Sequence, residues 1–124
     1  MIGIGIDAVE LDRFDTVLRR RPSVAERLFT EGERSAMAAR ANPTPGLAAR
    51  FAAKEAVLKA LGVGIGAVHW HEVEVVGAGE APSLRLSGRA ATLAAELGVA
   101  SWRLSLTHTD RTAHAVAVAL PGDR

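Results

Sequence analysis

The chain has 124 residues, of which 48% are hydrophobic and 23% charged, a balance typical of one folded domain rather than of a disordered segment. Lys and Arg total 15 and Asp and Glu total 14, so net charge predicts neither nucleic acid nor an anionic membrane as partner. The absence of cysteine excludes disulfides, cysteine zinc sites and thiol catalysis. Since no apolar run reaches the roughly 18 residues of a membrane span and no basic leader precedes Asp7, a soluble, cytoplasmic protein is expected.

Alanine occurs 24 times, whereas aromatic residues make up only 4% of the chain. Burial of apolar surface stabilises a fold by about 25 cal/mol per Å², and alanine buries little surface. The composition therefore predicts a thin core, for which oligomerisation is one common remedy.

The N-terminal segment predicts a strand over residues 1–7, because isoleucine alternates there with smaller residues. The isoleucine face is expected to be packed and the glycine face, which includes Asp7, to be bare. Helical segments follow: Pro22 ends the first, and a capping box of Thr30 and Glu33 begins another. The segments expected are 12–20, a short turn at 24–29, 31–40 and, after a loop at 42–46, the strongest helix at 47–61.

The second half of the chain alternates short strands with one more alanine-rich helix. A glycine-spaced loop follows the helix that ends before Gly62. The segments expected are strands 73–76 and 84–86 around a turn at 77–82, a helix at 87–97, and a hairpin of strands 101–107 and 113–120. This order predicts an α+β fold: a single small domain, residues 1–124, with a mostly antiparallel sheet packed against helices.

Asp7 and Glu55 are the acids whose surroundings favour chemistry. Asp7 lies among glycines, where it could hold a cation and admit a ligand against bare backbone, although capping of the next segment is the commoner role of such an Asp. Glu55 lies beside the apolar stripe of the 47–61 helix, where a carboxylate is costly unless it is paired or binds metal. The alternative for Glu55 is a plain surface pair with Lys59, one turn later.

Two further features carry both a functional and an ordinary interpretation. His108 shares its strand face with three apolar residues, and a histidine there is more often a core residue than a ligand. A basic stretch that includes Arg13 and Arg20 is either a solvated face or a docking patch for an acidic protein. No aromatic residues interleave with this stretch, which disfavours single-stranded nucleic acid.

The sequence resembles the phosphopantetheinyl transferases in three motifs that occur in the expected order over essentially the whole chain. The first is GIGID at residues 3–7, followed by VEL at 9–11. The second and most specific is RFAAKEAVLKALG at 50–62. The third, SLTH at 105–108 followed by a hairpin, is similar to the C-terminal motif of one subgroup, the holo-acyl-carrier-protein synthases.

This resemblance implies transfer of 4′-phosphopantetheine from coenzyme A to a serine of an apo acyl carrier protein, with release of adenosine 3′,5′-bisphosphate. It implies that Asp7 and Glu55 hold Mg²⁺, and that Lys59 and His108 contact phosphate. It further implies a homotrimer whose active sites lie at protomer interfaces. The remaining residues that it assigns are Arg50, Gly62, Gly64 and Pro82 at the nucleotide and Arg13 and Arg20 at the carrier protein.

The sequence departs from the family pattern at two positions. Thr109 stands where some members carry an acid, so removal of the serine proton falls either to Glu55 or to a metal-bound water. Val24 is smaller than the apolar contact expected at the docking stretch. Two alternatives stay open at this point: a module that binds coenzyme A or a nucleotide without catalysis, and a domain that only docks a carrier protein. Whether the carrier serves fatty acid or polyketide synthesis is left open as well.

Overall fold

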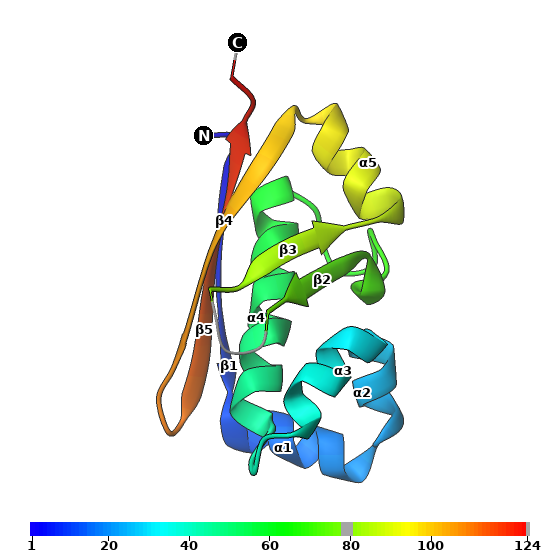
Figure 1. Ribbon diagram of the computed structural model, residues 1–124, viewed down its shortest axis with the longest axis vertical. Coiled ribbons are helices and arrows are strands. Elements are labelled where there is room, and N and C mark those ends of the chain that lie inside the picture. Colours follow the sequence, from blue (N-terminus) through cyan, green and yellow to red (C-terminus); the bar gives the residue numbers. More distant parts are fainter. Residues whose placement is uncertain (78–80, 124) are drawn as a thin grey trace.

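A three-stranded antiparallel sheet, with the long helix α4 against one face, forms the centre of the molecule (Figure 1). The computed structural model describes residues 1–77 and 81–123, so the expected turn at 77–82 lies partly outside the described residues. The elements are β1 (Gly3–Glu10), α1 (Leu11–Arg20), α2 (Ser23–Leu28), α3 (Glu31–Ala38), α4 (Thr44–Leu61), the short 3₁₀ helix η1 (Trp70–Glu72), β2 (Val73–Val76), β3 (Ser83–Leu86), α5 (Gly88–Glu96), β4 (Val99–His108) and β5 (Thr112–Pro121).

Strand β5 is the central strand of the sheet, and β1 and β4 are its edges. Both neighbours run antiparallel to β5; Asp7 of β1 is paired with Ala115, and His108 of β4 with Ala113. The hairpin of β4 and β5 and the α+β fold class expected from the sequence are thereby confirmed. The register also places Asp7 and His108 on opposite edges of the sheet.

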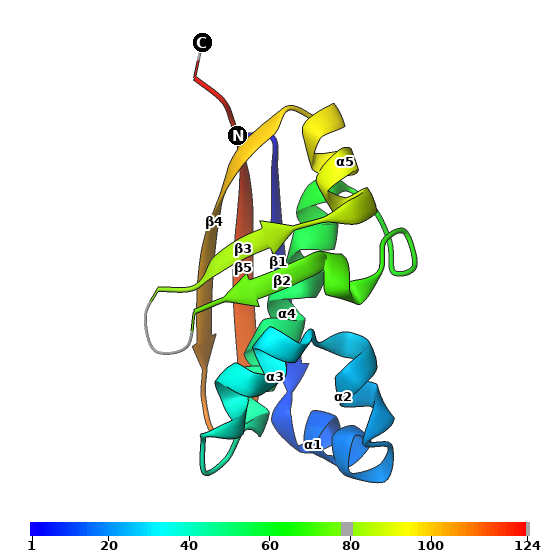
Figure 2. The same cartoon turned by 45° about the vertical axis from the view of Figure 1, so that its right-hand side comes forward.

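Helix α4 is enclosed between the sheet and a second layer made of the β2–β3 ribbon and α5, while α1, α2 and α3 gather near its N-terminal end (Figure 2). Of its 18 residues, 14 are buried, as expected for a helix that is covered on most of its circumference. The helix ends at Gly62, whose φ of 74° lies in the left-handed region that glycine tolerates.

The packed and the exposed face of β1 are exchanged relative to the prediction from sequence. The glycine face is covered, because α4 approaches so closely that a Cβ at Gly3 or Gly5 would overlap carbonyl oxygens of Ala60 and Ala56. The isoleucine face looks away from α4: the exposed fractions are 57% for Ile4 and 62% for Ile6. The expectation of a bare glycine face was therefore wrong, since glycine here allows contact between backbones rather than leaving space.

Alanine dominates the contact between the sheet and α4, where Trp102 of β4 is the one aromatic residue described, whereas Phe14, Phe29, Phe51 and Trp70 gather near α1. The rings of Phe14 and Phe51 are stacked with centroids 5.6 Å apart, and Phe51 lies 5.1 Å from Trp70. Phe14 also meets Phe29 edge to face at 6.3 Å. The thin core predicted from composition is thus found in the sheet layer but not at the α1 end of the molecule.

Element boundaries differ from the predictions mainly at proline and at helix ends. Helix α4 begins at Thr44, inside the loop expected at 42–46, because Pro45 falls in its first turn, where proline needs no backbone donor. The capping box of Thr30 and Glu33 is present, but its helix ends at Ala38. Among the described residues, no helix is long and apolar enough to cross a membrane.

Candidate active site

Strand β1 and helix α4 bring Asp7, Glu55 and Lys59 together. Lys59 Nζ donates to Asp7 Oδ1 at 3.1 Å and to the backbone oxygen of Ile6 at 2.9 Å. Lys59 therefore pairs with Asp7 and not with Glu55, so the simple pair one helical turn apart is not formed. Asp7 does not cap the next helix either, because Glu10 occupies the N-cap position of α1.

The carboxyl groups of Asp7 and Glu55 have too few hydrogen-bond donors around them. Asp7 Oδ2 is buried and has no hydrogen-bond partner among the described residues. Burial raises the pKa of Glu55 to about 7, helped by the neighbouring Asp7 carboxylate, while Lys59 opposes the rise. The negative charge of Asp7 favours a proton on Glu55, because two neighbouring ionised carboxylates repel each other.

The same shortage makes the pair suitable for a divalent cation. An orphaned carboxylate oxygen beside a second acid is the donor set that a hard cation such as Mg²⁺ binds, and Mg²⁺ commonly takes only one or two carboxylates and completes its shell with phosphates and water. Among the described residues, no three or more His, Cys, Asp or Glu side chains are grouped so that they could hold a metal ion. The protein would thus supply two ligands and leave the other positions to substrate.

A separate cavity contains three of the other predicted site residues. It has a volume of about 200 Å³ and is lined in part by Arg50, Pro82 and His108. His108 is exposed there, so the interpretation as a buried core histidine was wrong. This cavity opens at β4, the edge of the sheet opposite Asp7, with β5 between the two strands.

The remaining predicted residues lie apart from that cavity. Gly62 and Gly64 are exposed and follow the C-terminal end of α4, whereas Arg50 is in its N-terminal half. At a rise of about 1.5 Å per residue, some 18 Å of helix separate Arg50 from Gly62. Within one chain, therefore, Gly62 lies closer along the sequence of α4 to Glu55 and Lys59 than to Arg50 of the cavity.

Helix α1 carries the basic residues expected to dock a partner. Arg13 and Arg20 are both exposed. Arg13 borders an apolar groove of about 290 Å³. Val9 and Phe51, which also line it, are two residues from Asp7 on β1 and four residues from Glu55 on α4. The full lining is Val9, Glu10, Arg13, Phe14, Val17, Leu28 and Phe51.

Sequence reasoning missed Lys54, which is fully buried. Its ammonium group pairs with Glu33 at 2.8 Å and donates to the backbone oxygens of Trp70 and Val73. A signal was present, because at 100° per residue Lys54 falls only about 20° from Leu47, at the edge of the apolar stripe of α4. Burial lowers the pKa of Lys54, although Glu33 opposes that shift.

Comparison with known proteins adds to this geometry. The family model described as the 4′-phosphopantetheinyl transferase superfamily matches residues 3–119. The holo-[acyl-carrier-protein] synthase of Frankia casuarinae is 52% identical over 120 residues, which are 96% of this chain and 97% of the relative.

Solved structures of holo-[acyl-carrier-protein] synthases have the same fold. The enzyme from Neisseria meningitidis superposes with a TM-score of 0.87 at 32% identity, and the match covers 97% of this chain and 98% of the other. The enzyme from Bacillus anthracis, solved in complex with CoA (3′,5′-ADP), gives 0.80 at 34% identity and covers 98% and 97%.

Proposed function

The chain belongs to the 4′-phosphopantetheinyl transferase superfamily, and from this premise we propose how its residues carry out the transfer. It is an enzyme of the holo-[acyl-carrier-protein] synthase type, which moves phosphopantetheine onto an acyl carrier protein. The finer proposal is that the donor is coenzyme A, that the reaction needs Mg²⁺, and that adenosine 3′,5′-bisphosphate is released. A cytoplasmic location is part of the same proposal.

The observation that carries the proposal is the acid pair of Asp7 and Glu55. Its orphaned oxygen and the raised pKa of Glu55 mean that the pair lacks positive charge, which Mg²⁺ would supply. When bound, the ion neutralises the negative charge that develops on the pyrophosphate as its bond breaks.

Lys59 serves the same step from the chain itself. Its ammonium group is held over Asp7 and the Ile6 carbonyl, yet its side chain remains more than half exposed, so one of its three protons is free to contact a phosphate. In the transfer, the serine oxygen forms a bond to the pantetheine-side phosphorus and gives its proton to Glu55 or to a water. The bond from that phosphorus to the nucleotide-side oxygen breaks, and Lys59 stabilises the departing charge.

We place the nucleotide of coenzyme A in the cavity at β4, against Arg50, Pro82 and His108. Its pyrophosphate would lie at Asp7, Glu55 and Lys59, with Gly62 and Gly64 nearby. The cavity and the acid cluster lie at opposite edges of the sheet. This separation supports an active site that two chains share, as in the homotrimer implied by the family resemblance.

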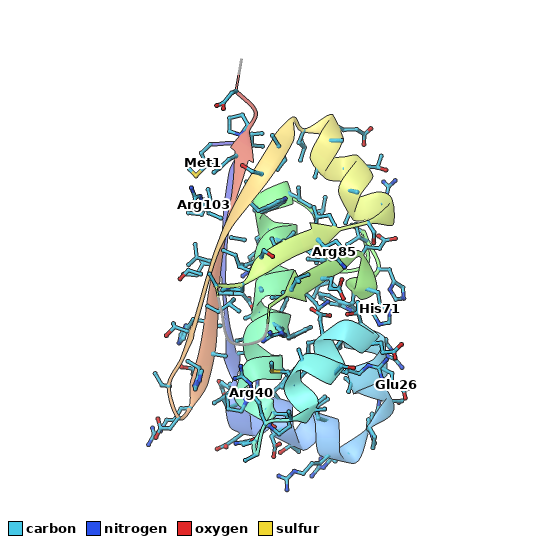
Figure 3. The ribbon with its side chains drawn as sticks, in the orientation of Figure 1. Met1, Glu26, Arg40, His71, Arg85 and Arg103 are labelled. Carbon is cyan, nitrogen blue, oxygen red and sulfur yellow. The ribbon has the colours of Figure 1, made fainter. Side chains whose placement is uncertain are left out.

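The outer face of the sheet supports assembly as well. Ile4 and Ile6 are exposed on β1, and the register sets Val118 and Val116 of β5 beside them. Figure 3 shows α4 on the opposite side of the sheet, and the described residues leave Ile4 and Ile6 of this apolar strip exposed. Burying such a patch is a common driving force for association.

The groove beside α1 suits the carrier protein. Arg13 and Arg20 offer positive charge to an acidic helix, and the groove that Arg13 borders is lined by Phe51, one helical turn before Glu55 on α4. A carrier held there would present its serine to the acid cluster.

One assay tests the proposed reaction. Apo carrier protein is incubated with the enzyme, coenzyme A and Mg²⁺, and the carrier is weighed by mass spectrometry. We expect the carrier to gain one phosphopantetheine only when coenzyme A and Mg²⁺ are both present, with excess EDTA stopping the reaction. A binding module would add no mass, and a docking domain would form a complex regardless of coenzyme A and metal.

Assembly is tested by light scattering after size-exclusion chromatography. The wild-type chain should elute as a trimer, and Ile6→Asp should dissociate it and abolish transfer, because a charge would then face the apolar strip. Leu97→Asp is the matched control, since Leu97 is exposed at the end of α5 and away from the sheet face. A monomeric wild type with full activity contradicts the shared site.

A further inference from the structure

Helix α2 forms one wall of the apolar groove beside α1, yet none of its six residues is buried. Its residue Leu28 lines that groove together with Phe14 of α1 and Phe51 of α4. A helix this short has little stability of its own. The position of this wall therefore depends on the contacts that hold α2 from outside.

The last turn of α2 leaves the backbone oxygen of Glu26 without a donor from the main chain. The Phe29 amide donates instead to the Ala25 oxygen at 3.0 Å. The Thr30 amide donates to the Glu33 side chain at 2.9 Å, as part of the capping box that begins α3. The start of α3 thus leaves the end of α2 incomplete, and a carbonyl at a helix end needs a donor from elsewhere.

The side chain of His71 supplies that donor from η1. Its Nε2 atom lies 2.6 Å from the Glu26 backbone oxygen, and since a carbonyl only accepts, Nε2 carries the proton. Among residues 1–77 and 81–123, no other hydrogen bond joins α2 to another helix or strand. Both residues are labelled in Figure 3, at the side of the molecule where η1 faces α2.

The 3₁₀ helix η1 is a firm base for this contact, because a buried side chain holds it. Lys54, which is fully buried, donates to the backbone oxygen of Trp70 at 3.0 Å. A capping box adds two hydrogen bonds within and around η1. His71 therefore connects the buried Lys54 cluster with a helix at the surface.

We propose that His71 is a positioning residue for the carrier protein: its bond to the Glu26 backbone oxygen holds α2 so that Leu28 forms the wall of the docking groove. This inference rests on the proposed function, which assigns that groove to the carrier. His71 is not among the described residues that line the groove or the cavity at β4. It acts through α2 and not by contact with either substrate.

Steady-state transfer tests this role, with the concentrations of carrier protein and coenzyme A varied separately. His71→Met keeps a long side chain but removes the donor. Loss of one hydrogen bond should raise KM for the carrier by about threefold to tenfold, whereas kcat and KM for coenzyme A should stay at their wild-type values. His71→Gln, whose amide can still donate, should recover most of the affinity for the carrier.

The matched control is Thr92→Val, which also removes a side-chain donor to a helix carbonyl. Thr92 donates to the Gly88 oxygen of α5, at the other end of the molecule from α2 (Figure 1). This variant should leave all three kinetic constants unchanged. An equal rise of both KM values in His71→Met, a fall in its kcat, or no change would overturn the proposal. A carrier KM that His71→Gln does not recover would overturn it as well.

Calorimetry with apo carrier protein separates this inference from the proposed reaction. If the wild type transfers nothing, the reaction fails as proposed. Weaker carrier binding by His71→Met than by the wild type, His71→Gln and Thr92→Val would still support the positioning role. A carrier that binds the wild type and His71→Met equally well, or that binds neither, would overturn it.

Discussion

Helix α4 carries two charged clusters on consecutive residues, Lys54 and Glu55, and the two clusters differ in how far their polar atoms are satisfied. Lys54 points into the layer formed with α3 and β2, where its exposed fraction is 0% and that of Glu33 is 1%. Glu55 points toward β1 and is half-buried beside Asp7.

In the Lys54 cluster every charge has its partners. Lys54 donates to Glu33 and to two backbone oxygens, while Glu33 accepts from the backbone nitrogens of Thr30 and Val75, each at 2.9 Å. In the Asp7 cluster one buried oxygen has no partner, and the pKa of Glu55 is raised to about 7. A buried ion pair whose hydrogen bonds are all made holds elements of the fold together. A pair of like charges with an unpaired oxygen destabilises the fold, and such a pair indicates a functional site.

The largest expected effect is on the free energy of unfolding, and it comes from breaking the Lys54 cluster. Lys54→Met should lower the free energy of unfolding by about 3–5 kcal/mol, because it leaves the Glu33 carboxylate buried without its counter-ion. Urea denaturation measures the change. Adding Glu33→Gln should recover part of the loss by removing that charge. A loss in unfolding free energy well under about 1 kcal/mol would contradict a stabilising role of the Lys54–Glu33 pair.

Removing either acid of the other cluster should affect catalysis and not folding. Asp7→Asn and Glu55→Gln should slow transfer by about 10²–10³-fold, because charge on the leaving group is no longer neutralised. Circular dichroism and the unfolding midpoint should show an intact fold. Glu96→Gln, exposed on α5, serves as the control and should keep full activity. Near wild-type transfer by either site variant would contradict the assignment.

The pH dependence of stability should also distinguish the clusters. A carboxyl group whose pKa is higher in the folded chain binds its proton more tightly there. The contribution of Glu55 is therefore present below pH 4.5 and lost as the pH rises toward about 7. At about 1.4 kcal/mol per pKa unit, reduced because Glu55 is half exposed, the loss should be about 1–2 kcal/mol.

Glu55→Gln lacks this loss and should gain stability relative to the wild type across that pH range in the absence of metal. Denaturation midpoints at several pH values measure the difference. A difference that is flat with pH, or that has the opposite sign, would show that burial and Asp7 do not raise the pKa of Glu55.

The smallest stability effect is expected for the second lysine of the same helix. Lys59→Met should change the free energy of unfolding by less than about 1 kcal/mol, because its pair with Asp7 is largely exposed on the lysine side. Transfer should nevertheless fall about tenfold or more. The same substitution at positions 54 and 59 therefore gives opposite profiles, and similar profiles would remove the distinction between the clusters.

Much of the fold was predictable because periodicity and breaker residues act locally. Gly62 ends α4 and the capping box begins α3 through contacts within a few residues. The orientation of β1 was not predictable in this way, because it depends on the distance between α4 and the sheet. That distance is set where Gly3 and Gly5 meet the carbonyls of Ala60 and Ala56, some 50 residues later.

For the site, the residue types were evident from the family motifs, but their grouping was not. Spacing gave Glu55 and Lys59 as partners, whereas the fold pairs Lys59 with Asp7 from another element. Arg40 was not predicted to line the cavity at β4, because nothing in its local sequence distinguishes it from a surface arginine. Its position beside Arg50 and His108 follows from how the chain folds.

The most direct measurement is Mn²⁺ binding followed by electron paramagnetic resonance of the free ion, with coenzyme A present. Mn²⁺ prefers the same oxygen ligands as Mg²⁺ and so reports on the same acids. The wild type should bind one ion per chain, and Asp7→Asn and Glu55→Gln should show no saturable binding. Undiminished Mn²⁺ affinity in either variant would contradict a cation site shared by these two carboxylates.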